Sequence, residues 1–299
     1  MSVLIAGTGA LACLFAAKLI RSGNEVTMMG SWVAGLDALR THGVRMLDLD
    51  GSTYTYPVVV KDGEECKGGY LQSLVLVKSW QTERVAKQLK RCLSADGIAL
   101  TLQNGLGNDE TLKAILNPER VALGVTTVGA RMLEPGYVQF TGNGKIYLGY
   151  HPHITDLALL LGKTGFQVER VPDPAALGWG KLVINAAINP LTALLRVTNG
   201  ELLERETARE LLAEAAKEAA SVAGKQGISL PYPDPVLAVE EVARNTAGNH
   251  SSMLQDVLRG TITEIDAING AIVQAGEQTG VPTPINRMLW MLVKSIDQH

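Results

Sequence analysis

Apolar and polar positions near the start of the chain follow a strand–helix–strand order. Residues 2–6 form a short apolar run of the kind found in buried parallel strands. An amphipathic segment over about 11–22 predicts a helix, Gly23-Asn24 ends it, and residues 25–29 predict a second strand. A strand, a glycine turn, a helix and a strand thus occupy about 30 residues, which is the context that a dinucleotide-binding fingerprint requires.

Strand patterns continue to about residue 171. Alternating residues between Val44 and Val60, around Asp50-Gly51, predict a hairpin. The other predicted strands cover 74–77, 98–102, 121–125, 138–140, 145–149 and 167–171, with a helix at 155–163. Val171-Pro172-Asp173-Pro174 then interrupts the pattern. We therefore place a dinucleotide-binding domain at 1–172 and a second domain at 173–299.

Beyond this boundary the periodicity is helical throughout. Predicted helices cover about 175–195, 207–226, 234–246, 261–279 and 285–295. Asp234-Pro235 gives the third of these a cap and a first-turn proline. The expected fold is α/β, with an N-terminal Rossmann-like dinucleotide-binding domain followed by an all-α C-terminal domain.

Composition excludes several classes of function. The chain of 299 residues is 46% hydrophobic and 19% charged, with a net charge of −3. Because no basic surplus and no polybasic run occur, we expect neither a nucleic-acid partner nor binding to a membrane surface. The apolar stretch 3–20 lacks a cationic start and contains Gly7 and Gly9, so it predicts neither a signal peptide nor a membrane span.

Cysteine and histidine usage points to a cytoplasmic protein without a metal site. Cys13, Cys66 and Cys92 lie far apart with no CxxC pair, so we expect reduced thiols and a cytoplasmic location. His151 and His153 have no carboxylate or thiol neighbours in the sequence, and we interpret them as residues of a surface loop.

The glycine turn Gly7-Thr8-Gly9-Ala10-Leu11-Ala12 is the first candidate for binding chemistry. Gly7 permits the tight turn, and Gly9 lets the backbone approach a pyrophosphate held at the helix N-terminus. Ala12 is an accepted small residue at the third position. We predict cofactor contacts at Gly7, Thr8, Gly9, Ala10 and Leu11; the alternative is a glycine turn that binds no nucleotide.

The end of the second strand, Met28-Met29-Gly30-Ser31-Trp32, bears on the choice of cofactor. An NAD-preferring site usually places Asp or Glu there for the ribose 2′-hydroxyl. With no acid present, Ser31 can donate to a 2′-phosphate, although no Arg or Lys is present to clamp it. We predict NADPH; the alternative is that Ser31 is a simple loop residue.

Two more strand ends carry polar side chains. Lys78 follows the predicted strand 74–77, and Asn104 follows the strand 98–102 in a glycine-rich turn. Ligands bind beyond the carboxyl ends of strands in open α/β sheets, so both residues are candidates for the cofactor crevice. A solvated lysine and an Asn-Gly turn formed for conformational reasons are the alternatives.

Lys181, Asn185 and Asn189 are spaced four residues apart in an otherwise apolar helix. At this spacing their side chains share one face, drifting about 40° per step around the axis. Buried polar groups need partners, so either other parts of the protein or a polar ligand must satisfy them. Pro190 adds a break that leaves the Ala186 carbonyl without its usual helical partner.

Two polar segments follow later in the helical half. Residues 245–252 form a polar turn before a helix start, where Asn249, Ser252 and backbone N–H groups suit a carboxylate; ordinary N-capping is the alternative. Glu264 lies in Thr261–Gly270, four residues before Ile268 on the same helix face. Thr261 with Glu264 matches a capping box, so a structural Glu264 is a competing interpretation.

Together these motifs resemble the ketopantoate reductase family (2-dehydropantoate 2-reductase). The matching stretches run in family order across most of the chain: Gly7-Thr8-Gly9-Ala10, Val77-Lys78-Ser79-Trp80-Gln81, Gln103-Asn104-Gly105, Gly180–Asn185, Ile188–Thr192, Asn199–Leu202, Ser251–Asp256 and Thr263–Asp266. The resemblance implies that Lys181 is the general acid and that Glu264 is the carboxylate of the site. It also implies substrate contacts from Lys181, Glu264, Asn185, Asn189, Asn249 and Ser252, and Lys78 and Asn104 beside the nicotinamide.

One departure concerns the cofactor, because many members of the family carry Arg near the position of Ser31 and this chain does not. The resemblance implies NADPH-dependent reduction of 2-dehydropantoate to (R)-pantoate, a step toward pantothenate and coenzyme A. The alternatives are a related reductase of another branched 2-keto acid and a non-catalytic NADPH-binding sensor. The apolar segment 288–292 packs either internally or between subunits, so a homodimer is possible.

Overall fold

The computed structural model describes residues 2–297. The chain forms two compact units, each described by itself. The first contains the residues up to Gln103 together with Asn108–Pro174, and the second combines Asn104–Gly107 with the chain from Ala175 onward. The short segment Asn104–Gly107 therefore packs with the helical half, although its neighbours in sequence on both sides belong to the first unit.

The first unit is built on an 8-stranded sheet in the order β12-β11-β8-β7-β6-β1-β2-β5. Its strands are β1 (Ser2–Ala6), β2 (Glu25–Gly30), β5 (Val59–Asp62), β6 (Tyr70–Val75), β7 (Leu93–Thr101), β8 (Val121–Thr126), β11 (Lys145–Gly149) and β12 (Gln167–Val171). The six strands from β8 to β5 run parallel, and β11 pairs antiparallel with β8. Because β1 continues to β2 on one side and pairs with β6 on the other, the strand order reverses at β1, where open sheets bind ligands.

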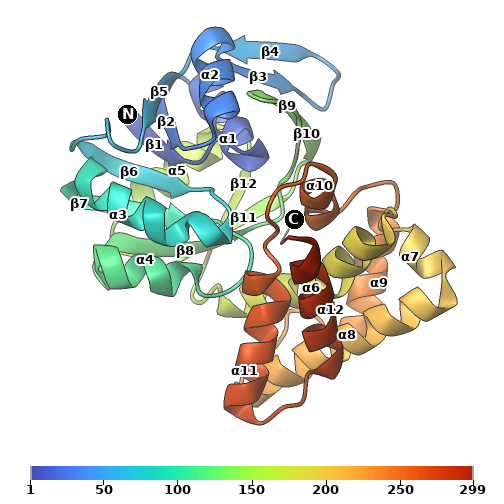
Figure 1. The fold of residues 1–299 in the computed structure, drawn as a ribbon. Coiled ribbons are helices and arrows are strands. Elements are labelled where there is room, and N and C mark those ends of the chain that lie inside the picture. Colours follow the sequence, from blue (N-terminus) through green and yellow to red (C-terminus); the bar gives the residue numbers. More distant parts are fainter. Residues whose placement is uncertain (1, 298–299) are drawn as a thin grey trace. The chain divides into compact units, whose positions relative to one another are not determined.

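Helices cover both faces of this sheet (Figure 1). They are α1 (Ala10–Arg21), α2 (Val33–His42), α3 (Thr82–Cys92), α4 (Asn108–Leu116) and α5 (Thr155–Lys163). Alternate residues of β1 enter two different cores, as the period of a strand requires. Val3 and Ile5 pack with α1 and α5, whereas Leu4 and Ala6 pack with α3 and α4. The buried β1 thus fixes the end of the glycine turn that follows it.

The predicted hairpin forms, as β3 (Val44–Leu47) and β4 (Thr53–Tyr56). It joins β10 (Tyr137–Gly142) and β9 (Gly129–Glu134) in a separate 4-stranded sheet, order β4-β3-β10-β9. This sheet packs against α1, so α1 is covered on both sides. The crossover helices α2, α3 and α4 were not identified from the sequence.

The second unit is helical and surrounds α6 (Ala175–Leu195), most of whose residues are buried. The other elements are α7 (Glu201–Glu204), α8 (Glu206–Lys225), α9 (Pro235–Asn245), α10 (Ser252–Leu258), the π-helical turn η3 (Asp266–Gly270), α11 (Ala271–Thr279) and α12 (Pro284–Ile296). The α/β fold with an N-terminal parallel-sheet Rossmann-like domain and a helical C-terminal region is therefore confirmed. Within residues 2–297, no helix is long and apolar enough to span a bilayer.

The helix predicted at 261–279 begins later than expected, at Asp266. The predicted capping box does not form, because the Thr261 hydroxyl donates to the Asp256 carbonyl instead. Thr263 is held by Asp297, through its N–H and its hydroxyl. These tertiary contacts keep residues 261–265 out of the helix and exclude the interpretation of Glu264 as a capping-box residue.

The expectation of three reduced thiols is wrong for two of the cysteines. Cys66 and Cys92 form a disulfide within the first unit, and Cys13 is free and buried. Burial raises the pKa of the Cys13 thiol to about 12. The two cysteines are 26 positions apart in sequence, a spacing that does not indicate a pair. The loop containing Cys66 packs against the end of α3, and this packing brings Cys66 to Cys92.

On α12, Leu289 is buried, whereas Met288, Met291 and Leu292 are exposed by 57%, 63% and 46%. The helix thus packs internally on one face and presents apolar side chains on another. The homodimer stays a prediction.

Candidate active site

The glycine turn between β1 and α1 has the geometry that a bound pyrophosphate needs. Gly7 adopts φ +137°, and a Cβ there would meet the Leu76 carbonyl oxygen at 2.8 Å, so a side chain is excluded. A Cβ on Gly9 would meet no atom within 4 Å, and Gly9 is the N-cap of α1 without a side-chain hydrogen bond to its N–H groups. An open approach to backbone N–H groups at a helix N-terminus fits a nucleotide phosphate.

Packing holds this turn in place. The Gly7 N–H donates to the Met29 carbonyl, and the Leu76 N–H donates to the Ala6 carbonyl. Thr8 is buried and Ala10 and Leu11 are partly buried in the first turn of α1. The open N-terminus of α1 at Gly9, with the side-chain-free turn at Gly7 before it, fits the phosphates of a dinucleotide.

The end of β2 carries Ser31, which is exposed as a ribose-binding residue must be. Sheet order adds a neighbour that the sequence did not indicate, because β5 pairs with β2 and places Asp62 opposite Gly30. Asp62 Oδ1 accepts hydrogen bonds from the N–H groups of Glu64 and Glu65. An acidic side chain thus lies on the strand next to Ser31, where the sequence alone predicted none.

Lys78 is partly buried after β6, at the start of a short 3₁₀ turn (Ser79–Gln81). Gln103 ties this strand end to the next one. Its amide donates to the Val77 carbonyl at 3.0 Å and to the Thr82 hydroxyl at 2.8 Å. Gln103 was not predicted to contribute, although it precedes Asn104 directly in the motif quoted above.

Asn104 lies with the second unit and meets Glu264, which is 160 residues away in sequence. The Asn104 amide donates to Glu264 Oε2 at 3.4 Å. Gly105 makes the approach possible, because a Cβ there would lie 2.4 Å from the Ala267 carbonyl oxygen, and Leu106 N–H donates to that same oxygen. The structure thus places Asn104 on a candidate catalytic carboxylate, within the part of the chain that also carries Lys181.

Lys181 and Glu264 form the charged part of the site. Glu264 is 5% exposed and Lys181 is partly buried. Burial lowers the pKa of the Lys181 amine to about 8, and the negative charge of Glu264 acts in the opposite direction. Lys181 is therefore largely protonated at neutral pH yet gives up its proton readily, which suits a general acid.

The turn of α6 that carries Lys181 is fixed from one side by the segment before α9. The Tyr232 hydroxyl donates to the Gly180 carbonyl at 2.8 Å. A Cβ on Gly180 would lie 2.6 Å from Pro231, so only glycine permits this packing. Burial raises the pKa of Tyr232 above its ordinary value, so its phenol stays neutral. Asn185 and Asn189 continue the same face, partly buried and buried respectively.

Asn249 and Ser252 are exposed at the start of α10. The neighbouring Ser251 is the N-cap, and its hydroxyl accepts from the Leu254 N–H and bonds the Thr192 hydroxyl at 2.6 Å. The Asn249 carbonyl accepts from the Asn199 N–H. The loop is thus anchored to the end of α6 just after Asn189, by buried hydroxyls that the sequence analysis did not single out.

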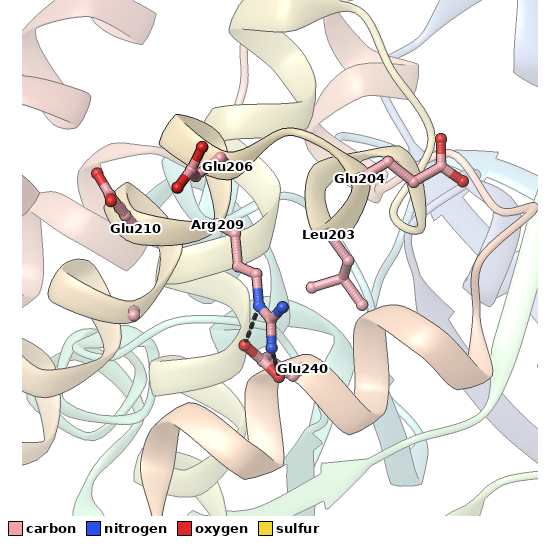
Figure 2. Close-up of a pocket in the computed structure, with 7 residues that line it drawn as sticks. Leu203, Glu204, Glu206, Arg209, Glu210 and Glu240 are labelled. Carbon is pink, nitrogen blue, oxygen red and sulfur yellow. Dashed lines mark hydrogen bonds and ion pairs between the residues drawn. The ribbon is translucent and has the colours of Figure 1, made fainter.

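A cavity of about 390 Å³ lies elsewhere in the second unit, between α8 and α9 (Figure 2). Arg209 and Glu240 line it, and Arg209 donates to both oxygens of Glu240 at 2.6 and 2.8 Å. Arg209 thereby lowers the pKa of Glu240. None of the candidate site residues lines this cavity, so it is no part of the candidate site.

The chain is similar to known proteins over nearly its whole length. The family model described as "Ketopantoate reductase PanE/ApbA" matches residues 3–153, and its C-terminal counterpart matches 175–297. The 2-dehydropantoate 2-reductase of Archaeoglobus fulgidus is 35% identical over 303 residues, covering 99% of this chain and 97% of the relative. That of Halobacterium salinarum is 33% identical, covering 98% of each chain.

Solved structures are similar over the whole chain as well. A ketopantoate reductase from Ralstonia eutropha JMP134 superposes with a TM-score of 0.92 at 32% identity, covering 100% of both chains. A D-mandelate dehydrogenase in a ternary structure with NADH and anilino(oxo)acetate gives a TM-score of 0.93 at 27% identity, covering 100% of this chain and 98% of that chain. By its family models and its full-length relatives, the chain belongs to the ketopantoate reductase family of oxidoreductases.

Proposed function

We propose that this protein reduces 2-dehydropantoate to (R)-pantoate with NADPH, a step toward pantothenate and coenzyme A, with Lys181 as the general acid. The observation that carries the proposal is the charged group of the second unit. Buried Glu264 accepts a hydrogen bond from Asn104 and supports the charge of Lys181. Family membership supports the same activity, because the relatives named above are 2-dehydropantoate 2-reductases.

The residue types suit the reduction of a 2-keto acid. The nicotinamide, when bound, supplies the hydride. As the carbonyl carbon is reduced, negative charge develops on its oxygen, and the Lys181 amine delivers a proton there. Glu264 keeps that amine protonated until substrate binds. Asn185, Asn189 and Glu264 offer polar groups for the substrate hydroxyl.

Asn249, Ser252 and the adjacent N–H groups offer donors for the substrate carboxylate. The loop that carries them is anchored through the Ser251 hydroxyl and the Asn249 carbonyl, which limits the freedom of its backbone. Gly7, Thr8, Gly9, Ala10, Leu11 and Ser31 would hold the cofactor, with Lys78 and Asn104 assigned beside its nicotinamide by the family resemblance.

Replacing Lys181 tests the proposal. Lys181→Ala is expected to lower kcat for ketopantoate reduction by at least about 100-fold, because general acid catalysis contributes roughly 10²–10⁴. NADPH affinity, measured by fluorescence titration, should stay within about twofold. Lys217→Ala, on an exposed lysine of α8, is the matched control. An active Lys181→Ala enzyme would contradict the role given to Lys181. If the wild-type protein fails to oxidise NADPH with every keto acid tested, the sensor hypothesis is favoured instead.

A second candidate is a reductase of the same family that acts on another branched 2-keto acid. The similarity to a D-mandelate dehydrogenase whose structure contains anilino(oxo)acetate supports this second candidate. The two candidates are distinguished by measuring kcat/KM for ketopantoate, for its analogue without the hydroxyl and for phenylglyoxylate. A site built for the hydroxyl should reject the analogue by a large factor, because its polar groups are then unpaired. Equal kcat/KM for ketopantoate and this analogue would favour the second candidate.

The preference for NADPH can be tested at the end of β2. Asp62 lies opposite Gly30. Its negative charge would disfavour a nearby 2′-phosphate, whereas Ser31 could donate to one. We expect Asp62→Asn to raise the ratio of kcat/KM for NADPH over NADH by several-fold, and Asp37→Asn, on exposed α2, to leave it unchanged. A wild-type enzyme that prefers NADH would contradict the NADPH assignment while leaving the reductase assignment intact.

A further inference from the structure

A chain of buried amides connects α6 to the segment that carries Glu264. Pro190 has no N–H, so the Ala186 carbonyl in α6 loses its usual helical donor. Asn269 Nδ2 donates to that carbonyl at 3.0 Å and also to Asn286 Oδ1 at 3.0 Å. Both asparagines are completely buried. A residue of η3 thus replaces the missing helical hydrogen bond inside α6.

The orientation of both amides is unambiguous. Asn286 Nδ2 donates to the Ala215 carbonyl and to Glu218 Oε2, which are acceptors only. Asn286 must therefore present its oxygen to Asn269, and Asn269 must present its NH₂ group to Asn286 and Ala186. The order of donors fixes Asn269 between α6 and α12.

The Glu218 carboxylate fixes the far end of this chain of amides. It accepts hydrogen bonds from the backbone N–H groups of Ile285 and Asn286 in the first turn of α12. The amides therefore end on a charged group of α8, so four elements share one network.

Asn269 keeps these bonds at a cost, because its own Oδ1 is buried and has no hydrogen-bond partner among the described residues. The turn that places it is a π-helical one, closed by the Gly270 N–H donating to the Ile265 carbonyl at 3.0 Å. Such turns occur frequently at functional sites. Ile265 follows Glu264 directly, so the turn that directs Asn269 toward α6 is continuous with the carboxylate of the proposed site.

We propose that Asn269 is a positioning residue, which locks the segment carrying Glu264 onto the proline-broken part of α6 and thereby sets the position of Glu264 relative to Lys181. This inference rests on the roles proposed above for those two residues. Within the second unit, α6 carries Lys181, and η3 begins at Asp266, two residues after Glu264. Asn269 hydrogen-bonds the two elements to each other.

The titration of Lys181 is the readout that a purely structural role would not change. Glu264 is the charged group that acts on the Lys181 amine, and the Tyr232 phenol beside Gly180 is neutral. If Asn269→Leu moves Glu264 away, the Lys181 amine loses part of the support for its charged form. The midpoint of its titration should fall by about 0.5 pH units or more, and kcat should fall by about tenfold or more, because small misplacements are costly.

The titration is measured by the rate at which an amine-reactive reagent labels Lys181 as a function of pH, read by mass spectrometry. The kcat for ketopantoate reduction is measured on the same samples. Glu240→Gln, which breaks the Arg209 pair between α8 and α9, is the control for loss of stability alone. It should lower Tm without moving the Lys181 midpoint.

Pro190→Ala separates positioning from simple hydrogen-bond satisfaction. Alanine at 190 restores an N–H for the Ala186 carbonyl within α6, so the double variant Pro190→Ala/Asn269→Leu recovers Tm. Compared with Pro190→Ala alone, it should keep the lowered midpoint and the lowered kcat, because η3 is still not bonded to α6. Return of both values to those of Pro190→Ala would overturn the inference, as would an unchanged midpoint in Asn269→Leu.

The labelling measurement needs no turnover, so the two proposals fail separately. A wild-type protein that reduces no keto acid contradicts the proposed function, while the labelling midpoints still decide the role of Asn269.

Discussion

At the residue scale, the proposed chemistry depends on opposing effects on one amine. Burial favours neutral Lys181, and the charge of Glu264 favours its protonated form. The result is an amine that titrates near pH 8 instead of above pH 10. Lys181 and Glu264 both belong to the second unit, so the charge that supports the protonated amine comes from the same unit.

The pH dependence of the reduction follows from this balance. The protonated amine is the donor, so kcat should be constant below about pH 8 and fall up to tenfold per pH unit above it. Stability changes in the other direction. The lowered pKa penalises folding below about pH 8, and the penalty is lost as pH rises toward the unfolded value of 10.5. Initial rates from pH 6 to 10 check the first expectation, and a rate that rises through pH 9 would contradict it.

The hydrogen bond from Asn104 to Glu264 can be tested in the same way. Asn104→Ala leaves the buried Glu264 carboxylate with one hydrogen-bond donor fewer. Removing such a donor costs about 1–3 kcal/mol of free energy. We expect kcat/KM for the keto acid to fall by roughly 10–100-fold. Asn104→Asp should be worse, because it adds a like charge beside Glu264. Steady-state kinetics of both variants decide the point, and wild-type kinetics for Asn104→Asp would exclude a role for this contact.

At the scale of elements, the periodicity of the sequence predicted a helix or strand correctly where local interactions determine its bounds. The helix predicted at about 175–195 agrees with α6, because its apolar positions and the proline pair before it are local signals. The start of the helix predicted at 261 was wrong, because Asp297 holds Thr263 in an extended segment. The position of Asp62 beside β2 was not predictable either, because it depends on the order of strands in the sheet.

The candidate site shows the same division. The spacing of Lys181, Asn185 and Asn189 gave a shared helix face directly. The contact of Asn104 with Glu264 joins residues 160 apart in sequence. It depends on the tertiary packing of the glycine-containing loop Asn104–Gly107, which no local pattern predicts. The strand-end position pointed to Asn104 and the polar segment 261–270 pointed to Glu264. Neither these signals nor the family resemblance, which assigned Asn104 to the cofactor, indicated the hydrogen bond between them.

The anchor between α6 and α10 gives a prediction at this scale. Thr192→Val removes the hydroxyl that bonds Ser251 at 2.6 Å and leaves that buried N-cap with one partner fewer. We expect a loss of about 1 kcal/mol in the free energy of unfolding and a KM for the keto acid raised several-fold, with kcat nearly unchanged. Thr279→Val, which removes a hydroxyl bonded only within α11, is the control. Equal kinetics for both variants would show that the loop needs no anchor.

At the scale of the whole molecule, the proposed ligands are assigned to different units. The residues proposed for the dinucleotide lie mostly in the sheet unit, and those proposed for the keto acid lie in the helical unit, each with a hydrophobic core of its own. Asn104–Gly107 is the exception, since it leaves the sheet unit in sequence and packs with the helical one.

Hydrogen exchange can separate the two binding functions. NADPH at 100 times its Kd should stabilise the folded protein by about 2.7 kcal/mol. It should protect the amides of residues 7–11 most strongly, because these residues would hold its phosphates. Ketopantoate should instead protect 181–189 and 249–254. In Lys181→Ala the NADPH protection should persist and the protection by keto acid should weaken, since the nucleotide contacts belong to the sheet unit. Loss of NADPH protection at 7–11 in Lys181→Ala would contradict the assignment of the two ligands to separate units.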